Sequence, residues 1–217
     1  LLLSLYKHYY KEARPPHLRL VPIGNLRLKL AAFKPDPRRN LDIAVFPMVT
    51  RWNKRFMREA IALAQAFPDR TVHFKMKPDR NAIEIEEFRS EVQHAPDNFI
   101  WREVDAYELL RCVSYAVACG STLSAESLQF GVATFVIDLD PMEANFLYRD
   151  FPEMCVGNAA EIVSRINAIE DGSRPYGFDA MKRLIELPPK DASHTIRAVM
   201  IPEKSDPKGF VSEARAG

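Results

Sequence analysis

The chain has 217 residues, of which 47% are hydrophobic and 27% charged, and its formal net charge is +1 at pH 7. This composition is typical of an ordinary globular protein, and a net charge near zero argues against nucleic acid as the main partner. The three cysteines, Cys112, Cys119 and Cys155, form no C-x-x-C pair. Their spacing argues against a zinc site or a disulfide framework and is typical of a protein of the reducing cytoplasm.

The chain divides into three parts by its sequence pattern. Residues 1–36 have the pattern of the end of a preceding domain followed by a linker, marked by the prolines of "KPDPRR". Because the sequence starts in a helix-like stretch without methionine, we expect it to be a piece of a longer protein. Residues 37–171 predict one α/β domain, and residues 172–217 a C-terminal helix and tail.

Within the predicted domain, apolar strand patterns alternate with helical patterns. This alternation predicts βαβ units, hence a Rossmann-like parallel sheet with helices on both faces. Asp105 with Glu108, and Asn158 with Glu161, have the spacing of a helix-capping box. In chain order, strands are predicted over 41–47, 71–77, 99–103, 114–119 and 133–138, and helices over 53–67, 82–93, 106–112, 122–130 and 160–170.

A polar cluster follows the fourth predicted strand. Gly120 comes directly after that strand, Ser121 is the predicted N-cap of the next helix, and Glu126 lies four residues beyond Thr122. In an open parallel sheet, ligands bind outside the carboxyl ends of the strands, where loops lead into helices. Hydroxyls and backbone N–H groups there suit a phosphate, and the glutamate suits a ribose diol. A well-capped helix is the structural alternative, although a capping-box glutamate would stand at position 124, which is serine.

The stretch "DAYELLRCVSYAVACGSTLSAESLQFGVATFVI" resembles the C-terminal half of glycosyltransferases with the two-domain GT-B fold. These enzymes have a Ser/Thr turn after a strand, a glutamate four or five residues on, and an "LxxGxP" pattern. Ala133 stands where the proline is usual. "VPIGNLRLKL", "TVHFKMKPD" and "PEMCVGNAAEIVSRINAI" are similar to further family segments, so the resemblance covers roughly residues 20–170. It is strongest to transferases of bacterial capsules and surface glycans, of polysialyltransferase-like and glycerophosphotransferase-like type.

The resemblance implies a function and a set of site residues. The chain would bind a nucleotide-activated sugar as its substrate, without a metal or other cofactor. It would serve surface polysaccharide synthesis with a glycan or lipid-linked acceptor, the latter bringing it to a membrane surface. The acceptor domain would be missing, so the chain alone would bind its donor without transferring it. The implied donor contacts are Gly120, Ser121 and Thr122 on the phosphate, Glu126 on the ribose, and Lys75 or Lys77 as a cation.

The sequence departs from the family where a histidine precedes proline, because Lys77 occupies that place. A lysine can still meet a phosphate as a point charge, but it is a poor acid or base at pH 7 unless burial lowers its pKa. If the predicted strand runs over 71–77, His73 lies on the same face as Lys75 and Lys77. His73 and Lys77 are therefore the catalytic candidates. A structural histidine and solvated lysines are the alternatives.

Two other interpretations stay open. Asp138 and Asp140 follow a strand at the spacing of a Mg²⁺-binding phosphatase or GT-A-like enzyme. A Rossmann-like domain can also be a non-catalytic binding or assembly module, because fold does not fix function. Thr50, Arg51 and Asn53, in the loop after the first strand, are weaker candidates for phosphate contact.

Overall fold

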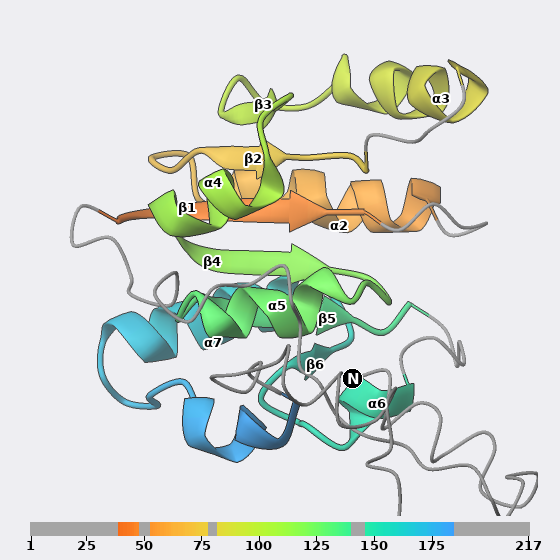
Figure 1. Cartoon of the computed structure of the whole chain (residues 1–217). Helices are drawn as coiled ribbons and strands as arrows, with labels where there is room; N and C mark the ends of the chain where they lie inside the picture. The colour runs from red at the N-terminus through yellow and green to blue at the C-terminus, as the bar shows by residue number, and fades with distance from the viewer. Residues whose placement is uncertain (1–38, 48–52, 78–81, 140–145, 185–217) are drawn as a thin grey trace, which may run out of the picture.

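The computed structural model describes residues 39–47, 53–77, 82–139 and 146–184. Within these ranges the chain forms one parallel sheet of six strands, shown in Figure 1, in the order β3-β2-β1-β4-β5-β6. This architecture confirms the predicted Rossmann-like α/β fold. In chain order the strands are β1 (Asn40–Phe46), β2 (Val72–Phe74), β3 (Phe99–Trp101), β4 (Val113–Ala118), β5 (Ala133–Ile137) and β6 (Cys155–Val156).

The strand order reverses direction between β1 and β4, which pair with each other although two strands separate them in sequence. β1 therefore has β2 on one side and β4 on the other, with Ile43 opposite both Val72 and Tyr115. This order is that of the doubly wound sheet, and its switch point is where such folds bind their ligands. The β1–β4 junction is thus the first place to look for a site.

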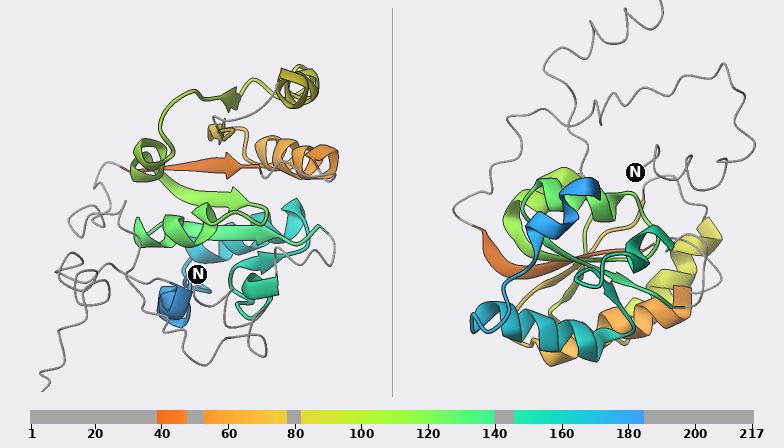
Figure 2. Two further views of the ribbon diagram at one scale, coloured as in Figure 1. Left: turned by 45° about the vertical axis from the view of Figure 1, so that its right-hand side comes forward. Right: turned by 90° about the horizontal axis from the view of Figure 1, so that it is seen from below.

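Helices cover both faces of the sheet (Figure 2). In the view from below, α2, α3 and α7 lie on one face, and α4 and α5 on the other. None of the helices in the described ranges is both long enough and apolar enough to span a membrane. The helices are α2 (Asn53–Ala66), α3 (Ala82–Val92), α4 (Ala106–Cys112), α5 (Leu123–Gln129), α6 (Phe146–Arg149) and α7 (Ala159–Glu170), followed by the 3₁₀ helix η3 (Phe178–Leu184).

Each strand contributes apolar side chains to both faces because both faces are covered. In β1, Ile43 and Val45 pack into the core under α2 and α7, whereas Ala44 and Phe46 pack under α4. All four are buried, which explains why β1 reads as a continuous apolar run rather than as an alternating one. Complete burial of such side chains stabilises the fold by about 1.5–3 kcal/mol for each large residue.

The predicted helix caps are present with some differences in detail. Asp105 caps α4 by accepting a hydrogen bond from the Tyr107 backbone N at 2.8 Å. Asn158 caps α7 by accepting one from the Glu161 N at 3.0 Å. The helix after β4 begins one residue later than predicted, with Thr122 in the N-cap position and the Ser121 hydroxyl accepting from the Leu123 N at 3.2 Å.

The segment after α7 packs back onto the sheet. The Tyr176 hydroxyl donates a hydrogen bond to the Thr134 carbonyl at 2.5 Å and accepts one from the Thr134 N at 3.0 Å. The chain up to residue 184 therefore belongs to the same folded unit as the sheet. The predicted boundary near residue 36 and the rest of the predicted tail lie outside the described residues.

The strands predicted over 71–77 and 99–103 are shorter than expected. β2 ends at Phe74 and β3 at Trp101; directly after them, the Lys75 N still donates to the Val45 carbonyl at 2.9 Å and the Arg102 N to the Phe74 carbonyl at 2.8 Å. β6 and α6 were not predicted, since two and four residues are too short to show a periodic pattern.

Candidate functional site

A cleft of about 680 Å³ lies at the carboxyl ends of β1, β2 and β4, beside the point where the strand order reverses. Its size is in the range of small-molecule sites. Four segments supply its lining: the end of β1 and the residue after it (46–47), the loop after β2 (75–77), the loop after β3 with the start of α4 (103–107), and the turn after β4 with the start of α5 (120–123 and Glu126). The fold therefore brings together segments that lie as much as 80 residues apart in sequence.

Six of the seven predicted site residues line this cleft. They share one property, a position directly after the carboxyl end of a strand or in the first turn of the helix that follows. These six are Lys75, Lys77, Gly120, Ser121, Thr122 and Glu126.

The Gly-Ser-Thr turn is held in a defined shape. Gly120 has a φ of +59°, a backbone conformation that L side chains rarely adopt. The Tyr148 hydroxyl of α6 donates a hydrogen bond to the Ser121 carbonyl at 2.8 Å. Burial raises the pKa of Tyr148, so the phenol stays protonated and available as a donor. The turn thus presents Gly120 without a side chain toward the cleft and is fixed from behind.

Glu126 has a partner that the sequence did not reveal. The Tyr107 hydroxyl donates a hydrogen bond of 2.6 Å to Glu126 Oε2. The Tyr107 ring stacks on Phe130, with ring centroids 5.4 Å apart. Tyr107 also lines the cleft. No sequence signal could have found this pair, because it depends on how α4 and α5 pack on the same face of the sheet.

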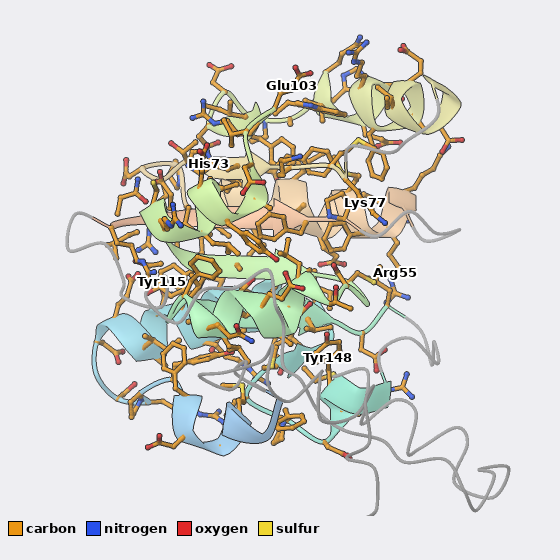
Figure 3. The ribbon with its side chains drawn as sticks, in the orientation of Figure 1. Arg55, His73, Lys77, Glu103, Tyr115 and Tyr148 are labelled. Atoms are coloured by element: carbon orange, nitrogen blue, oxygen red, sulfur yellow. The ribbon has the colours of Figure 1, made fainter. Side chains whose placement is uncertain are left out.

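Among the described residues that line the cleft, two lysines carry positive charge. Lys75 is half-buried and its Nζ donates to the Met76 carbonyl at 2.6 Å. Lys77 is exposed, and in the described part of the chain it has no ion-pair partner. Glu103, which Figure 3 labels near β3, also lines the cleft. The cleft therefore carries both signs of charge, with the cations after β2.

His73, the seventh predicted residue, is not among the residues that line the cleft. Its side chain is buried, and Figure 3 shows it toward the opposite end of the strands from Lys77. Its Nε2 lies 3.0 Å from Asp42 Oδ2, and its Nδ1 accepts a hydrogen bond from Arg102 Nε at 3.0 Å. Because arginine can only donate, the ring carries its proton on Nε2.

The structure therefore does not place His73 in the cleft with Lys77, and a catalytic role for His73 stays a prediction. Strand alternation does not extend to Lys77, since β2 ends at Phe74. Burial lowers the pKa of His73 and outweighs the neighbouring Asp42, so the imidazole is a neutral structural link between β1, β2 and the segment after β3. β2 therefore places no other acid or base in the cleft that could replace the histidine of the family, whose place Lys77 occupies.

The alternative metal site has little support among the described residues. Both carboxylate oxygens of Asp138 are bonded to Arg149, to Nε at 2.8 Å and to Nη2 at 3.2 Å. No cluster of three or more His, Cys, Asp or Glu side chains suited to a metal occurs in the described ranges. Asp140 lies outside the described residues, as do Thr50 and Arg51.

No protein-family model matches the chain, and no curated protein sequence matches it. Several solved structures are similar in three dimensions, and two of them are described here. One is the GtfA/B complex, with a TM-score of 0.57 and 15% identity over 92% of this chain and 42% of that chain. The other is a variant of the wall teichoic acid polymerase TagF, with a TM-score of 0.52 and 14% identity over 76% of this chain and 44% of that chain.

The chain therefore shares its α/β fold with these two proteins, and this fold is consistent with the C-terminal domain of a GT-B enzyme. The resemblance expected from the Gly120–Glu126 region is thereby confirmed at the level of fold. This chain spans less than half the length of either similar chain. At 14–15% identity the likeness carries the GT-B architecture and leaves donor, acceptor and activity to be argued from the cleft.

Proposed function

We propose that this chain is the donor-binding portion of a glycosyltransferase that moves a sugar or sugar-phosphate-like group from a nucleotide-activated donor in surface polysaccharide synthesis. One observation supports this most directly. A cleft at the switch point of a GT-B fold gathers two lysines, the Gly-Ser-Thr turn and Glu126. The lysines suit the negative charge of a phosphate, and the Gly-Ser-Thr turn offers it N–H and hydroxyl donors. Glu126 can accept hydrogen bonds from ribose hydroxyls.

In this proposal each group has a separate task. The backbone and hydroxyls of residues 120–122 contact the donor phosphate, and the missing side chain of Gly120 permits close approach. Lys75 and Lys77 act as point charges on the phosphate oxygens. Glu126 accepts hydrogen bonds from the ribose hydroxyls through Oε1, because Oε2 is occupied by Tyr107.

The proposed reaction breaks the bond between the transferred group and the departing phosphate oxygen, and forms a bond from that group to an acceptor hydroxyl. Negative charge accumulates on the leaving nucleotide, where the lysines stabilise it electrostatically. The proton of the acceptor hydroxyl goes to a base that we assign to the acceptor domain, as in two-domain GT-B enzymes. Lys77 therefore replaces the family histidine in charge stabilisation and not in proton transfer.

A thermal-shift panel with CMP, CDP, UDP, GDP and ADP, each at millimolar concentration with and without Mg²⁺, tests the proposal. A ligand at 100 times its dissociation constant adds about 2.7 kcal/mol of stability, roughly 8 °C in Tm for a domain of this size. We expect one nucleotide to stand out, equally with and without Mg²⁺. Glu126→Gln should weaken that shift while leaving the circular dichroism spectrum unchanged.

Glu108→Gln is the matched control, because Glu108 is an exposed glutamate of α4 that does not line the cleft. It should keep the wild-type shift. Absence of a shift with every nucleotide would favour the non-catalytic module. A shift that requires Mg²⁺ would favour a metal-dependent enzyme, and unfolding of Glu126→Gln would mean that this glutamate is structural.

A further inference from the structure

We infer that Tyr107 is a positioning residue that makes the cleft selective for ribonucleotides over deoxyribonucleotides, by holding the Glu126 carboxylate fixed. This inference rests on the proposed function, since it concerns the same cleft and the same glutamate.

Tyr107 is itself held at three points. Its backbone N donates to the Asp105 carboxylate at 2.8 Å, which fixes the first turn of α4. Its ring stacks on Phe130 at 5.4 Å with an interplanar angle of 25°, and Phe130 is only 2% exposed. Its hydroxyl makes the 2.6 Å bond to Glu126 Oε2. The donor is thus preorganised before any ligand arrives.

The bond to Glu126 has the geometry of a strong interaction. An O–H···O⁻ distance of 2.6 Å is typical of a charge-assisted hydrogen bond, which is roughly twice as strong as a neutral one. It engages one carboxylate oxygen only. Among the described residues, Glu126 Oε1 has no hydrogen-bond partner, and Glu126 lines the cleft. One oxygen is anchored and the other is left for a ligand.

Anchoring turns a flexible side chain into a selective one. A free glutamate can rotate toward water when a ligand lacks a hydroxyl, so the loss of that hydroxyl costs little. An anchored carboxylate cannot leave, and a deoxyribose would bury its Oε1 without a partner. Sites built to hydrogen-bond a hydroxyl reject the analogue that lacks it for this reason. The ribose also finds the carboxylate already ordered, which reduces the entropy cost of binding.

The test is a calorimetric titration of wild type and Tyr107→Phe. The probes are whichever of CMP, CDP, UDP, GDP and ADP binds wild type most tightly, together with its 2′-deoxy and 3′-deoxy forms. Wild type should prefer the ribonucleotide to at least one deoxy form by about tenfold or more, as expected for a hydrogen bond to a charged group. Tyr107→Phe keeps the ring on Phe130 and should reduce this ratio to about threefold or less. The deoxynucleotide should bind the variant at least as well as it binds wild type.

Tyr115→Phe is the matched control. It removes a comparable bond, from the Tyr115 hydroxyl to Glu170 Oε1 at 2.8 Å, toward the amino ends of the strands and away from the cleft. It should keep the wild-type ratio. Glu126→Asp retains the charge but is one methylene too short to keep the Tyr107 bond, so it breaks the pair a second way if Tyr107→Phe folds poorly. It should also lower the ratio.

Two kinds of failure are distinct in this experiment. A wild-type protein that binds none of the nucleotides contradicts the proposed function, and the inference falls with it. A wild-type protein that binds a nucleotide without preferring ribose, or a Tyr107→Phe variant with an unchanged ratio, contradicts the inference alone. Equal weakening of ribonucleotide and deoxynucleotide by Tyr107→Phe would also overturn it.

Discussion

Replacing Glu170 with glutamine should destabilise the fold at neutral pH and have no effect in acid. Glu170, at the end of α7, accepts two hydrogen bonds from Arg70, of 2.7 and 2.6 Å, and a third from the Tyr115 hydroxyl at 2.8 Å. These contacts join α7, the loop before β2 and β4. Glu170→Gln keeps the shape of the side chain but removes its charge.

The size of the effect follows from the geometry and the partial exposure of the pair. The Arg70 and Glu170 side chains are 17% and 26% exposed. An exposed ion pair contributes at most about 1 kcal/mol, whereas hydrogen bonds to charged groups contribute about 1.5–3 kcal/mol each when buried. For a bidentate pair that is partly screened by solvent, we expect a loss of about 1.5 kcal/mol, or roughly 3–6 °C in Tm.

The difference in unfolding free energy between wild type and Glu170→Gln should depend on pH. The hydrogen bonds from Arg70 hold the pKa of Glu170 below its ordinary value of 4.5. The contribution is therefore complete above about pH 4.5 and is lost as the pH falls through the lower pKa of the folded state.

Urea denaturation of wild type and Glu170→Gln at pH 7 and at successively lower pH measures this difference. The gap between the two proteins should close as the pH drops below 4.5. Glu87→Gln, on the exposed side of α3, should match wild type throughout. A gap that persists unchanged in acid, or no gap at pH 7, would mean that the ionised Glu170 does not stabilise the fold through Arg70.

Three further predictions concern the histidine, the cleft and the alternative metal site. Burial lowers the pKa of His73 below 6.5, so the free energy of unfolding of wild type should fall as the pH drops from about 6.5 toward that lower pKa. In urea denaturation over this range, the unfolding free energy of His73→Gln should depend less on pH. An equal pH dependence of the two proteins would contradict this. Lys77→Ala should weaken binding of the preferred nucleotide about fivefold at low salt and less at 0.5 M NaCl, as measured by calorimetry, because the lost interaction is an exposed charge. Asp138→Asn should leave nucleotide binding and its independence of Mg²⁺ unchanged in the thermal-shift assay, because Arg149 already occupies that carboxylate; a Mg²⁺-dependent loss would revive the metal site.

Much of the fold was predictable because its signals are local. The helices begin at caps such as Asp105 and Asn158, whose hydrogen bonds involve residues only two or three positions away. β1 and β4 are long enough to show an apolar run. That six of the candidate site residues lie in one cleft was predictable as well, since they follow strands or begin the next helix and the carboxyl ends of parallel strands meet at one side of the sheet; their role in binding stays a prediction.

The remaining features depend on contacts between distant segments. His73 was misplaced because the alternation through "TVHFKMK" continues in the sequence, although the ladder itself ends at Phe74, opposite Trp101. Its true partners, Asp42 and Arg102, are each about 30 residues away. The Tyr107–Glu126 bond likewise spans 19 residues and exists only because two helices pack on one face.

The most direct test of the account is to locate the nucleotide on the protein. The measurement is a ¹H–¹⁵N correlation spectrum of the chain, titrated with the nucleotide that gives the largest thermal shift. We expect the largest perturbations on the amides of residues 75–77, 120–123 and 126, with little change at Tyr115 or Glu170, which lie toward the amino ends of the strands. Perturbations centred on Tyr115 and Glu170, or none at saturating nucleotide, would contradict the claim that the switch-point cleft is a donor site.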